Sequence, residues 1–146
     1  MASALSGFES ASDGAAVEQA SLALVELTLK AMTAAPQLSV LQLRVLLSVE
    51  RHGPLRLGEV AGLLDLSAPS ASRLVARLVD DGLILRNTPP ADRRQVQLVV
   101  SAKGRRLLTR LRGNRQRDID RVLDLMSPDD RSALVQGLAA FADASG

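Results

Sequence analysis

The chain has 146 residues, of which 47% are hydrophobic and 23% charged, a length and composition that suit one globular domain. It contains no cysteine, which excludes a disulfide framework, a zinc site built on thiolates and a thiol redox sensor. Its one histidine, His52, precedes Gly53-Pro54, a pattern that favours a helix end over a metal ligand. Because the sequence has neither an apolar run of about 18 residues nor a signal-peptide pattern, we predict a cytoplasmic protein without membrane contact.

The net charge of +2 is distributed unevenly along the chain. Residues 1–72 carry four basic and seven acidic side chains (−3), residues 73–121 thirteen and five (+8), and residues 122–146 one and four (−3). A basic block of this kind is typical of phosphate binding, and it predicts an affinity for nucleic acid that falls steeply with salt. A basic helix face without a ligand stays open as the interpretation of the stretch beyond Lys103.

The first part of the chain predicts a leader and two helices. Residues 1–14 are rich in Ser, Ala and Gly and are expected to be disordered. Residues 15–35 contain strong helix formers with apolar side chains on more than one side, so this helix must be buried, and a subunit interface would bury it. Ser39 followed by Gln42 has the pattern of a capping box, and the apolar positions after it predict a second core helix.

The next segment predicts a helix-turn-helix. A short helix over 58–65 is followed by Ser67, a good N-cap, and by a longer helix from about Ala68 to Asp81. One apolar stripe with i, i+3, i+4, i+7, i+8 spacing runs along the longer helix: Ala71, Leu74, Val75, Leu78 and Val79. Its solvent side is predicted to carry hydroxyl and guanidinium groups, which can bind base edges and phosphates of duplex DNA: Ser70, Ser72, Arg73 and Arg77.

Two apolar runs, 83–86 and 95–100, predict a β-hairpin, and the prolines between them fit its loop. The tip of this hairpin holds Arg93 and Arg94, which can reach into a narrow minor groove. Asp92 is expected to hold the Arg94 guanidinium in one orientation. A surface turn with solvated arginines is the alternative, and it is disfavoured directly after a helix-turn-helix pattern.

The last part of the chain predicts two more helices. Ser101 can cap a long, arginine-rich helix over about 102–126, and Ser127-Pro128 has the pattern of a new helix start. Helices at both ends of the chain are expected to pack together and against a second subunit, so that a two-fold dimer places two reading helices about one turn of DNA apart. The predicted fold is mainly α with a small β-hairpin wing (α+β), a winged helix-turn-helix with dimerisation helices at both ends.

Several motifs together resemble those of the MarR (multiple antibiotic resistance regulator) family, and the resemblance runs from about Val17 to Ala142. They are Leu38-Ser39-Val40-Leu41-Gln42, Gly58-Glu59-Val60-Ala61, Ser67–Val75, Asp80–Arg86, and Asp92-Arg93-Arg94 with Leu98 and Ser101-Ala102-Lys103-Gly104. The chain departs from the family pattern at Arg56, where a Thr N-cap is usual, at Pro89, where an acidic residue is usual, and at Ser101, where Thr is usual. The resemblance implies a homodimer that binds pseudo-palindromic operators, usually as a repressor that a small-molecule effector releases.

The sequence therefore predicts a transcriptional regulator that binds double-stranded DNA specifically. A winged-helix module that binds protein without specific DNA binding is the alternative, and arginines on both helix and wing disfavour it. No activated nucleophile, phosphate loop or carboxylate pair is recognisable, so we predict no enzyme activity, catalytic residue, metal or cofactor. Residues 15–146 are expected to form a single winged-helix domain, with the DNA-binding part over about 38–101 and dimerisation helices over about 15–35 and 102–143. The predicted DNA-binding residues are Ser67, Ser70, Ser72, Arg73, Arg77, Asp92, Arg93 and Arg94.

Overall fold

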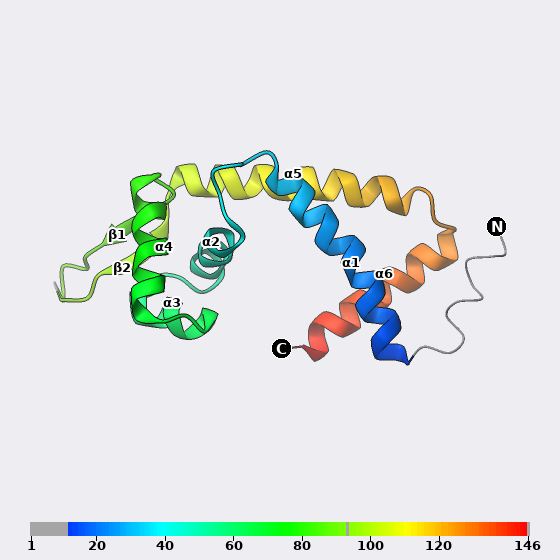
Figure 1. Ribbon diagram of the computed structural model, residues 1–146, viewed down its shortest axis with the longest axis horizontal. Coiled ribbons are helices and arrows are strands. Elements are labelled where there is room, and N and C mark those ends of the chain that lie inside the picture. Colours follow the sequence, from blue (N-terminus) through cyan, green and yellow to red (C-terminus); the bar gives the residue numbers. More distant parts are fainter. Residues whose placement is uncertain (1–11, 93, 146) are drawn as a thin grey trace. The chain divides into compact units, whose positions relative to one another are not determined.

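In a computed structural model, residues 12–92 and 94–145 are described, and they form six helices and one two-stranded antiparallel sheet (Figure 1). In chain order the elements are α1 (Asp13–Met32), α2 (Val40–His52), α3 (Leu57–Leu64), α4 (Ala68–Asp80), β1 (Ile84–Asn87), β2 (Gln97–Val100), α5 (Ala102–Leu123) and α6 (Pro128–Ala144). This confirms the predicted fold, a mainly α winged helix-turn-helix. Most of the expected leader lies outside the described residues. None of the helices in the described part of the chain combines the length and apolar character needed to cross a membrane.

The chain divides into two compact units. One consists of α1 as far as Ala31 together with the chain from Gly113 onward, and the other is Met32–Arg112. The second unit contains the helix-turn-helix, the hairpin and the first part of α5.

Serine side chains cap the starts of helices at the four positions that the sequence predicts: Ser39, Ser67, Ser101 and Ser127. At α2 the capping box is complete, because the Gln42 backbone N–H donates to Ser39 Oγ (3.1 Å) and the Ser39 backbone N–H donates to Gln42 Oε1 (2.8 Å). Ser67 and Ser127 each accept a bond from the backbone N–H three residues later, at 3.3 and 3.1 Å. These local bonds satisfy backbone donors that the first helical turn leaves unpaired.

The core of the Met32–Arg112 unit forms where α2, α3, α4, the hairpin and the start of α5 meet. The stripe predicted for α4 faces this core: Ala71, Val75 and Leu78 are buried, and two further stripe residues are half-buried against it. The largest fully buried side chains are Leu46, Leu78, Ile84, Leu108, Val45, Val60 and Val75. Helix α4 is therefore held from its apolar side, and its opposite side is left to solvent.

The hairpin has one more partner than the sequence predicts. Strands β1 and β2 pair from Ile84 opposite Val100 to Asn87 opposite Gln97. Leu55, just before α3, forms an antiparallel bridge with Leu98, with N–H to O=C bonds of 3.1 and 2.7 Å. A single bridging residue has no strand pattern, so only the folded chain reveals it. The bridge fixes the hairpin to the segment that leads into the helix-turn-helix.

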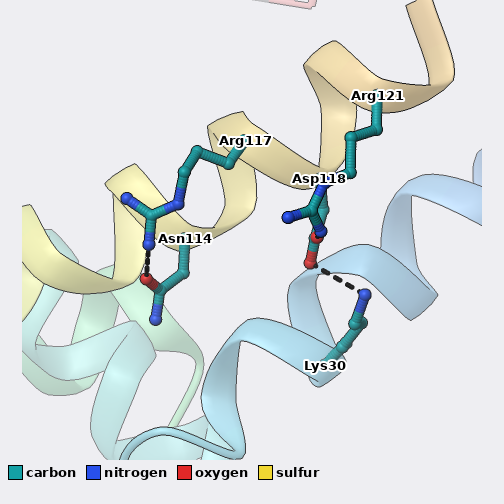
Figure 2. Close-up of polar contacts among 5 residues, drawn as sticks. All are labelled: Lys30, Asn114, Arg117, Asp118 and Arg121. Atoms are coloured by element: carbon teal, nitrogen blue, oxygen red, sulfur yellow. Dashed lines mark hydrogen bonds and ion pairs between the residues drawn. The ribbon is translucent and has the colours of Figure 1, made fainter.

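In the other unit, Asp118 of α5 forms ion pairs with two cations (Figure 2). Its carboxylate lies 3.2 Å from Lys30 Nζ of α1 and 2.8 Å from Arg121 Nη1, and its side chain is only 13% exposed. One turn away, Arg117 donates to the Asn114 side-chain oxygen. Of these contacts, the ion pair between Lys30 and Asp118 joins α1 to α5 within the unit, and the other two lie within α5.

The same unit keeps an uncovered apolar surface. No residue of α6 is buried, and large apolar side chains of α1 and α6 are exposed: Val17, Leu22, Val25, Leu29, Leu134, Val135, Leu138 and Phe141. Apolar area of this extent is unusual on a surface that faces only water.

Candidate nucleic-acid interface

The turn between α3 and α4 is closed by a residue in the left-handed backbone region. Asp65 has φ 51° and ψ 50°, and the next backbone N–H, of Leu66, donates to the Ala61 carbonyl oxygen (2.9 Å). Aspartate is one of the few non-glycine residues that adopt this conformation readily. The sequence predicts a helix over 58–65 followed by the N-cap Ser67 and gives no role to Asp65, although the residue type and position of Asp65 are a usable signal for the turn.

Helix α3 begins without a side-chain cap from Arg56, at the position where the family pattern has Thr. Instead the Arg56 backbone N–H donates to Glu59 Oε2 (2.6 Å), and the Arg56 guanidinium Nε lies 3.6 Å from the same oxygen. The backbone N–H, with a smaller contribution from the guanidinium, lowers the pKa of the Glu59 carboxyl. Glu59 thus supplies the capping that the Arg56 side chain does not.

The solvent side of α4 presents three of the predicted residues as a connected group. Ser67 Oγ donates to Ser70 Oγ (2.9 Å), and Arg73 Nη2 donates to the same Ser70 oxygen (3.5 Å). Arg77 lies one turn further along the same side and is exposed. Successive helical residues are about 100° apart, so Ser72 is about 200° from Ser70. Ser72 is half-buried and lies on the other flank of the helix, apart from this group.

The hairpin tip is shaped by Asp92. Its carboxylate Oδ1 accepts a bond from the Arg94 backbone N–H (3.0 Å), where the sequence predicted a contact with the guanidinium. The Asp92 backbone N–H also donates to the Pro89 carbonyl oxygen (3.2 Å), and the Asp92 carbonyl oxygen accepts from the Gln95 N–H (3.2 Å). Asp92 therefore orders the loop, and the exposed Arg94 side chain extends from it. The neighbouring candidate, Arg93, lies outside the described residues.

A dense set of bonds joins the end of α4 and the base of the hairpin to the start of α5. The buried Ser101 hydroxyl donates to the Gly82 carbonyl oxygen (2.6 Å) and accepts from the Gly104 backbone N–H (2.9 Å). Lys103 Nζ donates to the Asp81 carbonyl oxygen (2.7 Å). The sequence predicts the cap from Ser101, but it gives no signal for the contacts of Ser101 with Gly82 and of Lys103 with Asp81, about twenty positions earlier.

Three arginines of the candidate surface have no acidic partner among the described residues. Within residues 12–92 and 94–145 no ion pair involves Arg73, Arg77 or Arg94. By contrast, Arg112 of α5 donates from both terminal nitrogens to the Glu50 carboxylate, which raises the pKa of Arg112. An unpaired cation on a solvent-facing helix or loop keeps its donors available for phosphate oxygens and base edges. No three His, Cys, Asp or Glu side chains of the described segments are grouped as metal ligands would be.

Comparison with known proteins identifies the family to which the chain is similar. A sequence model described as the MarR family matches residues 38–96. The chain is 31% identical to the HTH-type transcriptional regulator ML2140 of Mycobacterium leprae over 125 residues, which cover 84% of this chain and 87% of the relative.

Two solved structures show the same fold. The structure of RV1404 from Mycobacterium tuberculosis has a TM-score of 0.83 and 31% identity, with 90% of each chain covered. The transcriptional repressor CouR, solved bound to a 23-mer DNA duplex, has a TM-score of 0.63 and 32% identity, with 90% of this chain and 92% of that chain covered. The chain therefore belongs to the MarR family of DNA-binding transcriptional regulators, which are not enzymes.

Proposed function

We propose that the protein is a homodimeric repressor that binds a pseudo-palindromic operator and is released from it by a small molecule. The observation that carries the DNA-binding part is the set of exposed arginines without acidic partners on α4 and the hairpin: Arg73, Arg77 and Arg94. The likeness to CouR, a repressor solved on duplex DNA, supports repression. Release by a small molecule follows from the family resemblance. A cytoplasmic location, with direct access to DNA, is part of the same proposal.

The individual roles follow from side-chain reach and donor type. Ser70 and Arg73 face major-groove base edges and adjacent phosphates, Ser72 reaches a phosphate from the other flank of α4, and Arg77 binds a phosphate further along. Arg93 or Arg94 enters the minor groove. Two residues act by positioning: Ser67 through the start of α4, and Asp92 through the loop at the hairpin tip.

The proposal also assigns DNA binding and dimerisation to different parts of the chain. Residues of about 38–101 bind DNA, and helices over about 15–35 and 102–143 form the dimer, within one winged-helix regulator domain over 15–146. The exposed apolar side chains of α1 and α6 support the dimer, because a second copy would remove them from water. A two-fold dimer matches the symmetry of an inverted-repeat operator.

A hollow of about 410 Å³ beside the end of α4 is the candidate place for the effector. It is lined by three cations and one carboxylate, Lys103, Arg106, Arg110 and Asp81, together with Gln37 and the apolar side chains of Leu83 and Leu107, so positive charge is in excess. This combination suits an organic anion with an apolar body. A screen of small organic acids for release of the operator tests the assignment, because Arg106→Ala should weaken the response to an active compound without changing DNA binding in its absence.

The alternative, a winged helix that binds protein instead of DNA, is not favoured. The regulators to which the chain is similar and the unpaired arginines on two separate DNA-facing elements support a nucleic-acid ligand.

The decisive experiment is selection from a fluorescent duplex library drawn from the protein's own upstream region, at two salt concentrations. We expect selection of an inverted repeat, with an affinity that falls by about 10³ or more between 50 and 200 mM salt if six to ten phosphates are contacted. Absence of selection at either salt would overturn the proposal in favour of the protein-binding alternative.

A further inference from the structure

We propose that Ser67 and Ser70 position Arg73 to read a guanine in each half-site of the operator. The proposal rests on the proposed function and adds to it the identity of one base and the residue that selects it.

The direction of the hydrogen bonds on α4 decides what Ser70 can offer. Ser67 Oγ accepts the Ser70 backbone N–H (3.3 Å), so its own proton is free to be donated to Ser70 Oγ (2.9 Å). Arg73 Nη2 donates to the same oxygen (3.5 Å). A serine hydroxyl has two acceptor lone pairs and one proton, and both lone pairs of Ser70 are engaged by these two donors. Ser70 therefore presents a donor to a ligand and no acceptor.

Arg73 offers donors as well. A guanidinium carries five N–H groups and no acceptor, and the bond to Ser70 engages one terminal nitrogen and so limits the rotation of the fork. The side chain is exposed, and no carboxylate among the described residues competes for its remaining donors. The pair thus forms a surface made only of donors, held in place by the N-cap of its own helix.

Guanine is the base that fits a surface of donors. Its major-groove edge presents two acceptors, N7 and O6, whereas adenine presents one acceptor and one donor, cytosine a donor, and thymine one acceptor beside a methyl group. An arginine fork binds N7 and O6 together, and the two bonds discriminate against the other bases.

Arg77 is a matched comparison on the same helix. It follows Arg73 by one turn, is also exposed, and has no side-chain hydrogen bond in the described part of the chain. An arginine that nothing orients suits a phosphate, which accepts bonds from many directions. Arg73 should therefore contribute affinity that depends on the base sequence, and Arg77 affinity that does not.

The test uses the full-length protein, the selected operator and a scrambled duplex of equal length. We expect Arg73→Ala to lower the affinity for the operator about 10- to 100-fold with a much smaller change on the scrambled duplex. Arg77→Ala should lower both affinities by a similar factor. Replacement of the contacted guanine by 7-deazaguanine, which lacks N7, should weaken binding of the parent protein and leave that of Arg73→Ala unchanged.

The positioning of Arg73 by Ser70 is tested separately, through the preference for guanine over adenine. Ser70→Ala keeps the backbone N–H that Ser67 caps, so thermal unfolding should not change, but it removes the oxygen that orients Arg73. We expect a loss of about 3- to 10-fold in the preference for guanine over adenine at that position, with restoration by Ser70→Thr. If an operator is selected but its base preferences are the same in Arg73→Ala, the guanine assignment is overturned and the proposed function stands. If no operator is selected, the proposed function is overturned and this inference with it.

Discussion

At the scale of single residues, Gly104 is a position where the absence of a side chain decides the packing. A Cβ there would collide with the Leu83 carbonyl group and lie 2.8 Å from Val100 Cγ1. We expect Gly104→Ala to lower the free energy of unfolding by about 1–3 kcal/mol, because the start of α5 would have to move away from the hairpin. Urea unfolding at equilibrium measures this.

Gly62→Ala is the control for that prediction. Gly62 is also helical, in α3, but nothing lies within 4 Å of a Cβ built on it. Alanine should stabilise the protein there by about 0.5–1 kcal/mol, because glycine loses more backbone freedom on folding. A Gly104→Ala protein as stable as the parent would contradict the close approach of α5 to Leu83.

Glu59 makes the start of α3 sensitive to acid. Its pKa is lowered from 4.5 because the carboxylate accepts the Arg56 backbone N–H and lies beside the Arg56 guanidinium. A folded-state pKa below the unfolded value means that this carboxylate stabilises the fold above pH 4.5, and that the contribution is lost as the pH falls through the lowered pKa. Glu59→Gln should therefore be less stable than the parent at pH 7 and equally stable in strong acid.

Thermal unfolding of both proteins over a pH series measures this effect. Glu18→Gln, at an exposed glutamate of α1, is the control for the loss of one negative charge. A Glu59→Gln deficit that persists unchanged in strong acid would indicate that the role of Glu59 is independent of its charge.

At the scale of elements, we expect the hairpin to contribute DNA affinity separately from the stability of the fold. Arg94 is exposed on a loop that Asp92 orders through the backbone, so its side chain contributes nothing to the core. We expect Arg94→Ala to weaken operator binding about tenfold or more, with unchanged circular dichroism and an unchanged dimer, because one minor-groove contact is lost.

Fluorescence anisotropy with the selected operator measures the affinity. Gln95→Ala, an exposed neighbour without charge, is the matched control and should bind nearly as well as the parent. An Arg94→Ala protein with the parent's affinity would remove the wing from the mechanism.

At the scale of the whole molecule, we propose that the exposed apolar side chains of α6 form the dimer interface. Leu134, Leu138 and Phe141 follow i, i+4, i+7 spacing and are all exposed, so they form one apolar strip that the chain itself does not cover. We expect Leu138→Glu to convert the dimer largely to monomer and to weaken operator binding, because a buried carboxylate without a partner is costly. Sedimentation equilibrium measures the assembly state.

The control for the assembly prediction lies on the same helix. Gln136→Glu introduces the same charge on the face opposite the strip, and it should leave the dimer intact. A Leu138→Glu protein that sediments as a dimer would exclude this strip from the interface.

Local chemistry made much of this protein predictable from its sequence. Ser39, Ser67 and Ser127 begin helices in the structure because an N-cap acts over three residues, and the stripe of α4 faces the core because its spacing matches the helical repeat. The separation of Ser70 from Ser72 was also available from that repeat, since residues two positions apart point to different sides of a helix.

The contacts that assemble these elements depend on residues distant in the sequence. Leu55 pairs with Leu98, the Ser101 hydroxyl bonds to the Gly82 carbonyl, and Gly104 is required by the approach of Leu83. The sequence alone determined where helices begin, which sides are apolar and where positive charge collects, because each depends on near neighbours. Only the tertiary structure decided how the helix-turn-helix, wing and α5 are joined, because backbone groups far apart in the chain find their hydrogen-bond partners only after the core has formed.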